Sequence, residues 1–404
     1  MFFYISFLRP PPIQAAPLGT ILITPQISND LRTEPYEASQ DIFYSWMPYP
    51  QANPTTTSSA IVGLKTTKPA KLTTYRNVSA YKEIPVPVPP GVREGQRWQL
   101  ILSPSAGTAP LRPGYYTVDM RDPAVGNAVL PVISMPILFS AKGLKGNAKK
   151  QEKIERMYLI SSLSPSTEEI THEFTPTREL KITEQTSFDL DKKIWDSGIG
   201  LSSWLVDFQQ LDKNKRNWSL GIVWDALFSQ EIRCMVELGA GTGIVSLTIA
   251  SLRAQFSTAE HKSDEIIATD LESAIPLLKQ NIDSNVSLYS HNIPEAEILD
   301  WEDGELPSSI RSLERLDVIL MSDVTYNTSS FPALLKTVSK LVKLREPPII
   351  ILGYKERDEA ERDVWIMLEE RGIRLEKIGQ RLGAAKPGVE IWFGQVVERS
   401  ATMV

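Results

Sequence analysis

The sequence is poor in the residues that build disulfides and zinc sites. It contains one cysteine, Cys234, and three histidines, His172, His261 and His291, which lie far apart along the chain. A single thiol excludes an intrachain disulfide, and the histidines lack the spacing of a metal site. Cys234 begins an apolar run, where a thiol is expected to be buried and inert. We therefore expect no metal centre, and a protein suited to a reducing compartment.

Long apolar segments are also missing. No run approaches the roughly 18 residues that a membrane-spanning helix needs. Residues 1–8 are apolar, but they are few, have no basic start, and lead into Arg9 and three prolines, which does not fit a signal peptide. We expect a soluble protein of the cytoplasm, with the nucleus as a second compartment, and no membrane partner.

Charge is distributed unevenly along the 404 residues. The net charge is −6, but residues 1–150 carry 15 Lys and Arg against 8 Asp and Glu, a balance of +7, which leaves −13 for the rest. Because nucleic-acid phosphates are bound by clustered basic side chains, the acidic part disfavours a nucleic-acid partner. It suits a basic peptide or a lysine-bearing protein surface, although ordinary solvated surface charge accounts for the same count.

The N-terminal 150 residues have the pattern of a β-rich module. They hold 20 of the 29 prolines and alternate short apolar runs with turn residues. Strands are predicted at residues 97–102, 114–118 and 132–139, in an arrangement such as a sandwich. Residues 10–60 are rich in Pro, Ser and Thr, which predicts partial disorder. Residues 143–150 have the composition of a flexible linker, so we place the domain boundary between residues 150 and 151; the role of residues 1–150 is not evident from their sequence.

Residues 151–404 show a different pattern, in which strands alternate with helices. A β-hairpin is predicted at residues 177–189. Apolar strands are predicted at residues 234–238, 265–269, 316–321 and 348–352, with helices at about 244–254, 272–282, 331–342 and 358–371. Two late strands, near 373–378 and 389–397, have no helix between them and are expected to form an antiparallel edge hairpin. This alternation predicts an α/β fold with a parallel sheet covered on both faces.

A glycine-rich turn joins the first of these strands to its helix. Residues 236–243 read Val-Glu-Leu-Gly-Ala-Gly-Thr-Gly. The glycines permit a tight turn and close approach of a ligand to the backbone and the free N–H groups of the helix. A dinucleotide motif would place its third glycine at position 244, whereas here Gly243 comes one residue early. Glu237 would repel a pyrophosphate but favours the ammonium of S-adenosylmethionine, which we predict as the cofactor.

Three further segments place polar or aromatic residues where strands end. Asp270 follows the second strand, where it either accepts both ribose hydroxyls of an adenosine or caps the next helix. Trp301 either packs on the adenine ring or is a surface-packing indole. Ser322, Asp323 and Tyr326 end the third strand, at the edge where doubly wound sheets bind ligands. Amino-methylating enzymes of DNA bases carry two prolines at this place; their absence here weakens a base-methylation reading.

Taken together, these motifs resemble a known family. The run Ile-Trp-Asp-Ser at residues 194–197, the glycine turn, Thr-Asp-Leu-Glu at 269–272, Trp301 and the pair Asp323-x-x-Tyr326 are similar to the non-SET protein-lysine methyltransferases of the methyltransferase-like 21 group, within protein methyltransferase family 16. The resemblance covers about residues 175–397. It implies a seven-stranded, Rossmann-like class I methyltransferase sheet. Residues 1–150 depart from the compact family pattern and form an extra N-terminal β-rich domain.

The resemblance also implies residue roles. Catalysis is assigned to Asp323 and Tyr326, which would line the lysine channel. The implied cofactor-binding residues are Trp195, Glu237, Gly239, Gly241, Gly243, Asp270, Trp301 and Ser322, with Asp270 at the ribose and Trp301 at the adenine. The implied function is methyl transfer by a monomer to a lysine of a protein substrate. Methylation of a small-molecule amine and a catalytically weak scaffold remain as alternatives.

Overall fold

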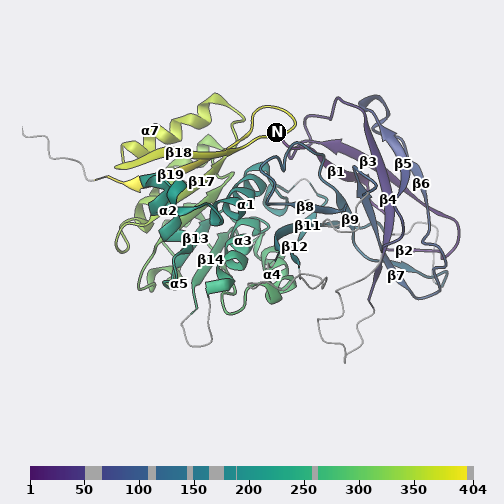
Figure 1. Ribbon diagram of the computed structural model, residues 1–404, viewed down its shortest axis with the longest axis horizontal. Helices are drawn as coiled ribbons and strands as arrows, with labels where there is room; N and C mark the ends of the chain where they lie inside the picture. Colours follow the sequence, from purple (N-terminus) through teal and green to yellow (C-terminus); the bar gives the residue numbers. More distant parts are fainter. Residues whose placement is uncertain are drawn as a thin grey trace, which may run out of the picture.

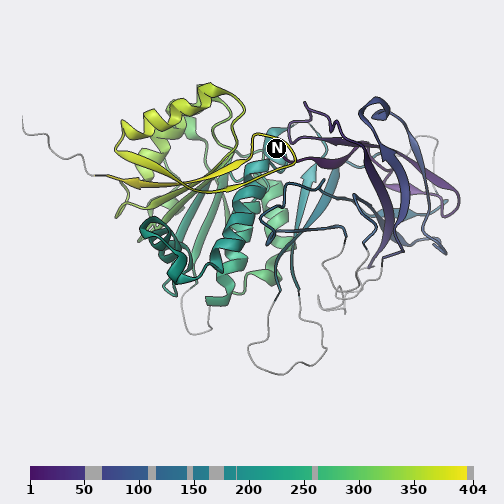
Figure 2. The ribbon, with the colours of Figure 1, turned by 45° about the horizontal axis from the view of Figure 1, so that its top comes forward.

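The computed structural model describes residues 1–50, 66–107, 115–142, 149–162, 177–187, 189–256 and 263–397. Two parts lie side by side, an α/β part and a part built of strands (Figures 1 and 2). Within the described residues, no helix is long and apolar enough to cross a membrane. Among the same residues, no group of three or more His, Cys, Asp or Glu side chains could hold a metal ion.

The α/β part contains a seven-stranded sheet. Its strands are β13 (Cys234–Leu238), β14 (Glu265–Asp270), β15 (Glu295–Ile298), β16 (Val318–Ser322), β17 (Ile349–Tyr354), β18 (Ile373–Arg381) and β19 (Val389–Val396). Their order is β15-β14-β13-β16-β17-β19-β18, with β13 to β17 parallel and β19 antiparallel to both of its neighbours. The predicted parallel sheet and its antiparallel edge hairpin are therefore confirmed.

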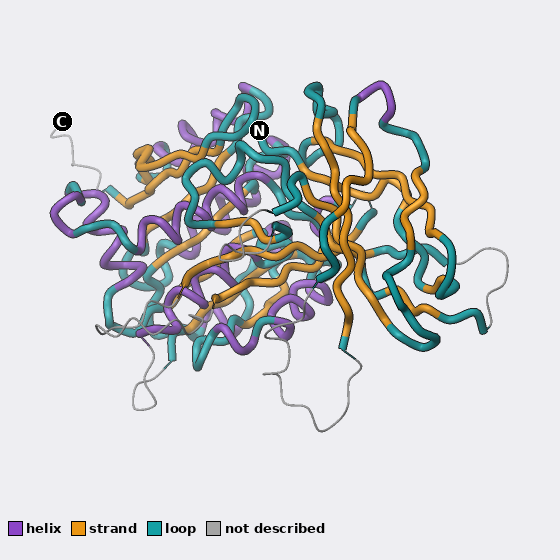
Figure 3. The backbone as a smooth tube through the Cα atoms, turned by 45° about the vertical axis from the view of Figure 1, so that its right-hand side comes forward, coloured by secondary structure: helices purple, strands orange, loops and turns teal. Residues whose placement is uncertain are grey.

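Helices cover both faces of this sheet. They are α1 (Asp196–Gln209), α2 (Trp218–Phe228), α3 (Ile244–Arg253), α4 (Ile275–Ser284), α5 (Ser308–Arg311), α6 (Phe331–Leu341) and α7 (Asp363–Glu369). Side chains of α1 to α4 join one buried apolar cluster, and those of α5 to α7 join a second cluster. Figure 3 shows these helices gathered around one sheet, with strands and loops predominating in the other part. The α/β prediction holds, although α1, α2, α5 and β15 were not among the predicted elements.

The N-terminal part is β-rich, as predicted. It holds β1 (Tyr4–Arg9), β2 (Gln14–Ala15), β3 (Thr20–Ser28), β4 (Gln40–Tyr49), β5 (Ala70–Tyr75), β6 (Ile84–Pro87), β7 (Arg97–Ser103), β8 (Thr117–Asp119), β9 (Val132–Ser134) and β10 (Ile137–Phe139). The disorder predicted for residues 10–60 is wrong for residues 10–50, because side chains such as Ile23, Ile42 and Trp46 are buried in a third apolar cluster. Residues 51–60 lie outside the described residues. The strand predicted at 132–139 is two strands, separated near Pro136.

The hairpin of β11 (Lys153–Ser162) and β12 (Thr177–Gln185) connects the two parts. It follows residue 150 in the chain, yet β11 pairs with β8 and β9 of the N-terminal sheet. Residues 177–185 are a single strand that pairs with 153–162, so the hairpin predicted within 177–189 is wrong. Hydrogen bonding therefore continues past the predicted boundary, and six of the eight residues of the predicted linker, 143–148, lie outside the described residues.

Two amide side chains, one in helix α4 and one directly after it, cover the edge strand β12. Asn281 accepts the backbone N–H of Thr183 at 2.8 Å and donates to its carbonyl at 3.0 Å. Asn285 does the same to Lys181, at 2.9 and 2.7 Å. These bonds satisfy backbone groups that an edge strand otherwise exposes. They attach the N-terminal sheet directly to the α/β part.

Candidate active site

The glycine turn lies between β13 and α3, as predicted. Gly239, Gly241 and Gly243 have φ angles of 66°, 54° and 82°, in the left-handed region that favours glycine. A Cβ on Gly243 would lie 2.5 Å from Leu278, and one on Gly239 would lie 2.8 Å from Val324. The turn therefore excludes side chains and keeps a bare backbone at the N-terminus of α3.

Glu237 is buried directly before this turn. Its Oε2 accepts hydrogen bonds from the backbone N–H of Ser246, at 2.9 Å, and from the Ser246 hydroxyl. Its Oε1 is buried and has no hydrogen-bond partner among the described residues. Burial raises the pKa of Glu237 to about 8. A buried oxygen without a partner beside a bare glycine turn fits a ligand that brings a positively charged donor.

Asp270 ends β14 and faces the same turn. Its Oδ2 accepts the backbone N–H of Gly241 at 2.6 Å, and its Oδ1 accepts that of Leu271 at 2.7 Å. Burial raises the pKa of Asp270 to about 6. Helix α4 begins at Ile275, after Ala274, so Asp270 does not cap it. Ribose binding by this carboxylate stays a prediction, now with a position beside the glycine backbone to support it.

Trp301 and Ser322 lie differently with respect to the turn. Trp301 opens a short 3-10 helix after β15, and its ring lies 3.6 Å from the position of a Cβ on Gly239. The indole therefore borders the glycine turn. Ser322 ends β16, and its hydroxyl lies 3.9 Å from the position of a Cβ on Gly198 in α1. Cofactor binding by Ser322 stays a prediction.

The predicted catalytic residues lie next to Trp195. The rings of Trp195 and Tyr326 are stacked, with centroids 5.9 Å apart and planes 14° apart. Tyr326 is 47% exposed, so the aromatic pair opens to solvent. Asp323 has a φ of 53° and accepts the backbone N–H of Ser197 at 2.8 Å. All of the predicted site residues except Trp195 thus lie in the last two positions of parallel strands or follow those strands, at the carboxyl edge where the fold class binds ligands.

A buried ionic cluster beside Asp323 was not predicted. Arg357 pairs with Asp323 through one guanidinium nitrogen and with Asp30 at 3.0 Å through another. Lys355 pairs with Asp30 at 2.9 Å and with Asp196 at 2.8 Å. Burial opposes the charge of Arg357, but Asp323 and Asp30 outweigh it and raise its pKa. The signal for the two cations was present in the sequence, because they directly follow the strand that ends at residue 354.

The strand order and this edge define the class of protein. A parallel sheet with an antiparallel strand inserted before its last strand, a glycine turn after the first strand and an acid after the second are the features of a class I, S-adenosylmethionine-dependent methyltransferase. Residues 175–371 match the family whose description is lysine methyltransferase. The match covers just under half of the chain.

Relatives with established names match parts of the chain. A UPF0665 family protein of Schizosaccharomyces pombe is 29% identical over 49% of this chain and 55% of its own length. The protein-lysine N-methyltransferase EFM6 of Saccharomyces cerevisiae is 29% identical over 33% of this chain and 54% of its own length. Mouse protein N-lysine methyltransferase METTL21A is 32% identical over 37% and 66%. The chain thus spans about half the length of the first two relatives.

Solved structures give a weaker likeness. The magnesium protoporphyrin IX methyltransferase of Synechocystis, with bound S-adenosylmethionine, has a TM-score of 0.33 and 17% identity, over 44% of this chain and 76% of its own.

Proposed function

We propose that the protein transfers methyl groups from S-adenosylmethionine to a lysine side chain of a protein substrate. The observation that carries this proposal is the stacked pair of Trp195 and Tyr326 beside Asp323, at the same edge of the sheet as the glycine turn. These residues lie in the segment that matches the lysine methyltransferase family. EFM6 and the METTL21A proteins of mouse and Xenopus tropicalis carry names of protein-lysine methyltransferases, which supports a protein acceptor.

The cofactor fits the residues at the glycine turn. Glu237 has a buried oxygen without a hydrogen-bond partner among the described residues, and Gly239 and Gly241 expose their backbone. The carboxylate of Asp270 lies beside this backbone, where it accepts the N–H of Gly241. When bound, S-adenosylmethionine supplies a methyl group on a sulfonium for transfer to a neutral amine. Trp301, which borders the same turn, is placed to pack against the adenine.

The aromatic pair and Asp323 address the protonation of the acceptor. A free lysine amine has a pKa of about 10.4, so it must lose a proton before it can attack. Stacked rings at the mouth favour the neutral amine, because they desolvate it. An unpaired carboxylate would hold the amine as an ammonium, but Asp323 is already paired with Arg357. We assign Asp323 to docking and orienting the amine, Tyr326 to a hydrogen bond with it, and most of the acceleration to alignment.

Exposure at the mouth favours a large acceptor. Tyr326 is nearly half exposed, so a side chain presented on a protein surface can reach it.

Our proposal includes a monomeric protein of the cytoplasm, with the nucleus as a second compartment, that acts on protein and not on nucleic acid. Its support is the buried, unpaired Cys234, whose pKa burial raises to about 12, and the acidity of the chain after residue 150.

The test is a transfer assay with methyl-labelled S-adenosylmethionine and a lysate. Wild-type protein is compared with Tyr326→Phe, Asp323→Asn and the control Asp363→Asn, which changes an exposed acid on α7. We expect a discrete labelled protein band that yields methyl-lysine on hydrolysis, weaker with the first two variants and unchanged with the control. Label found only in small molecules would instead indicate a metabolite amine. No label and no cofactor binding would indicate a scaffold.

A further inference from the structure

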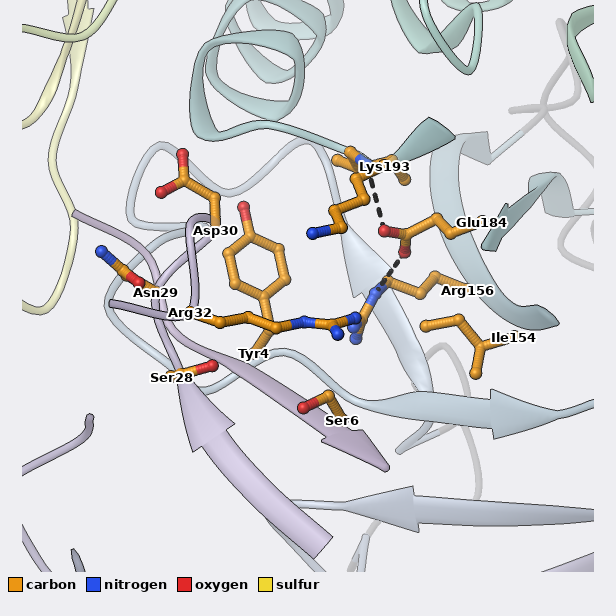
Figure 4. Close-up of a pocket in the computed structure, with 11 residues that line it drawn as sticks. Tyr4, Ser6, Ser28, Asn29, Asp30, Arg32, Ile154, Arg156, Glu184 and Lys193 are labelled. Carbon is orange, nitrogen blue, oxygen red and sulfur yellow. Dashed lines mark hydrogen bonds and ion pairs between the residues drawn. The ribbon is translucent and has the colours of Figure 1, made fainter. Parts of the chain in front are cut away.

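Asp30, a residue of the N-terminal β-rich part, lies in the ionic cluster of the methyltransferase edge. It follows β3 by two positions, and its side chain is completely buried. Figure 4 shows it at the pocket between the two parts, near Tyr4 and Asn29. Its carboxylate oxygens accept from Lys355 at 2.9 Å and from Arg357 at 3.0 Å.

Asp30 and Asp323 hold the same two partners. Both carboxylates bind the guanidinium of Arg357. Both also accept backbone N–H groups from the first turn of α1, Asp30 from Asp196 at 3.2 Å and Asp323 from Ser197 at 2.8 Å. The first N–H groups of a helix have no partner within the helix and attract anions. The result is a closed ring of Asp30, Arg357, Asp323 and the start of α1.

The ring stays charged although it is buried. Burial opposes ionisation of Asp30, but Lys355 and Arg357 outweigh it, and the pKa of Asp30 lies below its ordinary value. A planar guanidinium held by two carboxylates has a defined orientation, because each bond restrains the fork. The side chain of Arg357 is 13% exposed and its guanidinium carbon lies 5.1 Å from the centre of the Trp195 ring. Without Asp30, one of the two carboxylates that restrain Arg357 is lost, and its side chain can adopt rotamers that face the solvent.

We propose that Asp30 is a positioning residue of the transfer site: it fixes Arg357, and through Arg357 it keeps Asp323 in place. This inference rests on the proposed lysine methyl transfer at Asp323. It makes the N-terminal β-rich part a component of the site, rather than a separate module. Loss of Asp30 leaves the guanidinium of Arg357 held by one carboxylate, so that Asp323 is no longer fixed in one orientation toward the acceptor amine.

The test compares Asp30→Asn with a matched control, Asp264→Asn, in the full-length protein. Asp264 is also a buried acid, paired with Arg253 at 2.6 Å. It directly precedes β14, so it lies at the amino ends of the parallel strands, away from the site at their carboxyl ends. A double variant, Asp30→Asn with Lys355→Gln, removes one charge of each sign, so the cluster keeps its wild-type net charge while Arg357 still lacks Asp30. It separates the loss of the Asp30 contact from a change in net charge.

Two readouts are measured. The first is hydrogen exchange of the segment 194–201, which contains the Ser197 amide bound to Asp323. We expect its protection to fall at least tenfold in Asp30→Asn and in the double variant, and to be unchanged in Asp264→Asn. The second is transfer kinetics on the protein band labelled by the wild type. We expect kcat to fall at least tenfold, with KM for the protein not raised and cofactor affinity unchanged.

The outcomes separate the two proposals. Unchanged Ser197 protection in Asp30→Asn overturns the positioning role, and so does an equal loss of protection in Asp264→Asn. Wild-type kcat in both Asp30 variants overturns it as well. If the wild type labels no protein, the methyl-transfer proposal fails, while the exchange readout still decides whether Asp30 positions Asp323.

Discussion

Glu237 and Asp270 flank the glycine turn, and burial raises the pKa of both. Glu237 reaches about 8 and Asp270 about 6. The pKa of each carboxyl group therefore lies closer to neutral pH than the pKa of an exposed Asp or Glu does. Perturbed carboxyl groups that meet at one edge of a sheet are typical of a binding site.

Glu237 makes a prediction about stability and pH. Its folded pKa lies above its ordinary value of 4.5, so the folded protein keeps a proton that the unfolded chain releases between pH 4.5 and 8. Its contribution to stability is present below pH 4.5 and is lost as the pH rises toward 8. Because Gln cannot ionise, Glu237→Gln should gain unfolding free energy relative to the wild type over this window, by up to about 1.4 kcal/mol per pH unit. Urea unfolding without cofactor at pH 5 and pH 8 measures this difference; parallel curves would contradict it.

Asp270 makes a prediction about cofactor affinity. A hydrogen bond to a charged acceptor contributes about 1.5–3 kcal/mol, and 1.4 kcal/mol is a factor of ten in binding. Asp270→Ala should therefore weaken binding of S-adenosylmethionine at least about tenfold by calorimetric titration. Glu272→Ala removes an exposed acid two residues away and serves as the control. Equal affinities for all three proteins would exclude a ribose role for Asp270.

Helix α4 connects three segments through one side chain. Asn281 is fully buried and bonds both backbone groups of Thr183 in β12, and it also donates to the carbonyl of Thr242 in the glycine turn at 2.9 Å. Its position in the helix thus ties the edge of the N-terminal sheet to the cofactor turn.

The second stability prediction concerns Asn281→Ala. The change leaves three buried backbone groups without a partner, and each such group costs about 1–3 kcal/mol. We expect a loss of at least about 3 kcal/mol in the free energy of unfolding, measured in urea. Ser284→Ala, on an exposed position of the same helix, should change it by less than about 0.5 kcal/mol. A loss below 1 kcal/mol for Asn281→Ala would mean that water replaces the amide.

The two parts of the molecule share a core. The apolar cluster under α1 and α3 includes Phe2, Tyr158 and Ile182 of the strand-rich part together with Leu201 and Leu247 of the methyltransferase part. The interface also contains the buried ionic ring, and Arg156 pairs with Glu184 at 2.7 Å between β11 and β12 (Figure 4). Independent domains usually meet through smaller and more polar surfaces.

The whole molecule should therefore unfold as one unit. We expect a single calorimetric transition whose calorimetric and van't Hoff enthalpies agree, because exposing either part uncovers the shared cluster. Saturating S-adenosylmethionine should move this one transition upward as a whole. Two separate transitions, of which the cofactor moves only one, would show that the parts are independent.

The sequence by itself determined the elements with a strong local signal. Strands with continuous apolar residues, such as β13 and β16, and the amphipathic helix α6 were predicted because periodicity is a local property. The order Glu-x-Gly-x-Gly-x-Gly likewise identified the cofactor edge, because a turn of this geometry depends on adjacent residues. Helix α1 escaped prediction: it is buried on nearly all sides, so its apolar residues show no periodic face.

Only the tertiary structure decided which distant residues meet. Asp30 lies 293 positions before Asp323, and no local pattern links an acid after a β-strand to a guanidinium after another. Strand β12 likewise found its partner in residues 153–162 and its cover in α4, where the pairing is set by burial of a shared core rather than by turn residues. Contacts of this kind depend on the free energy of packing the whole chain, which a local reading of residue types does not contain.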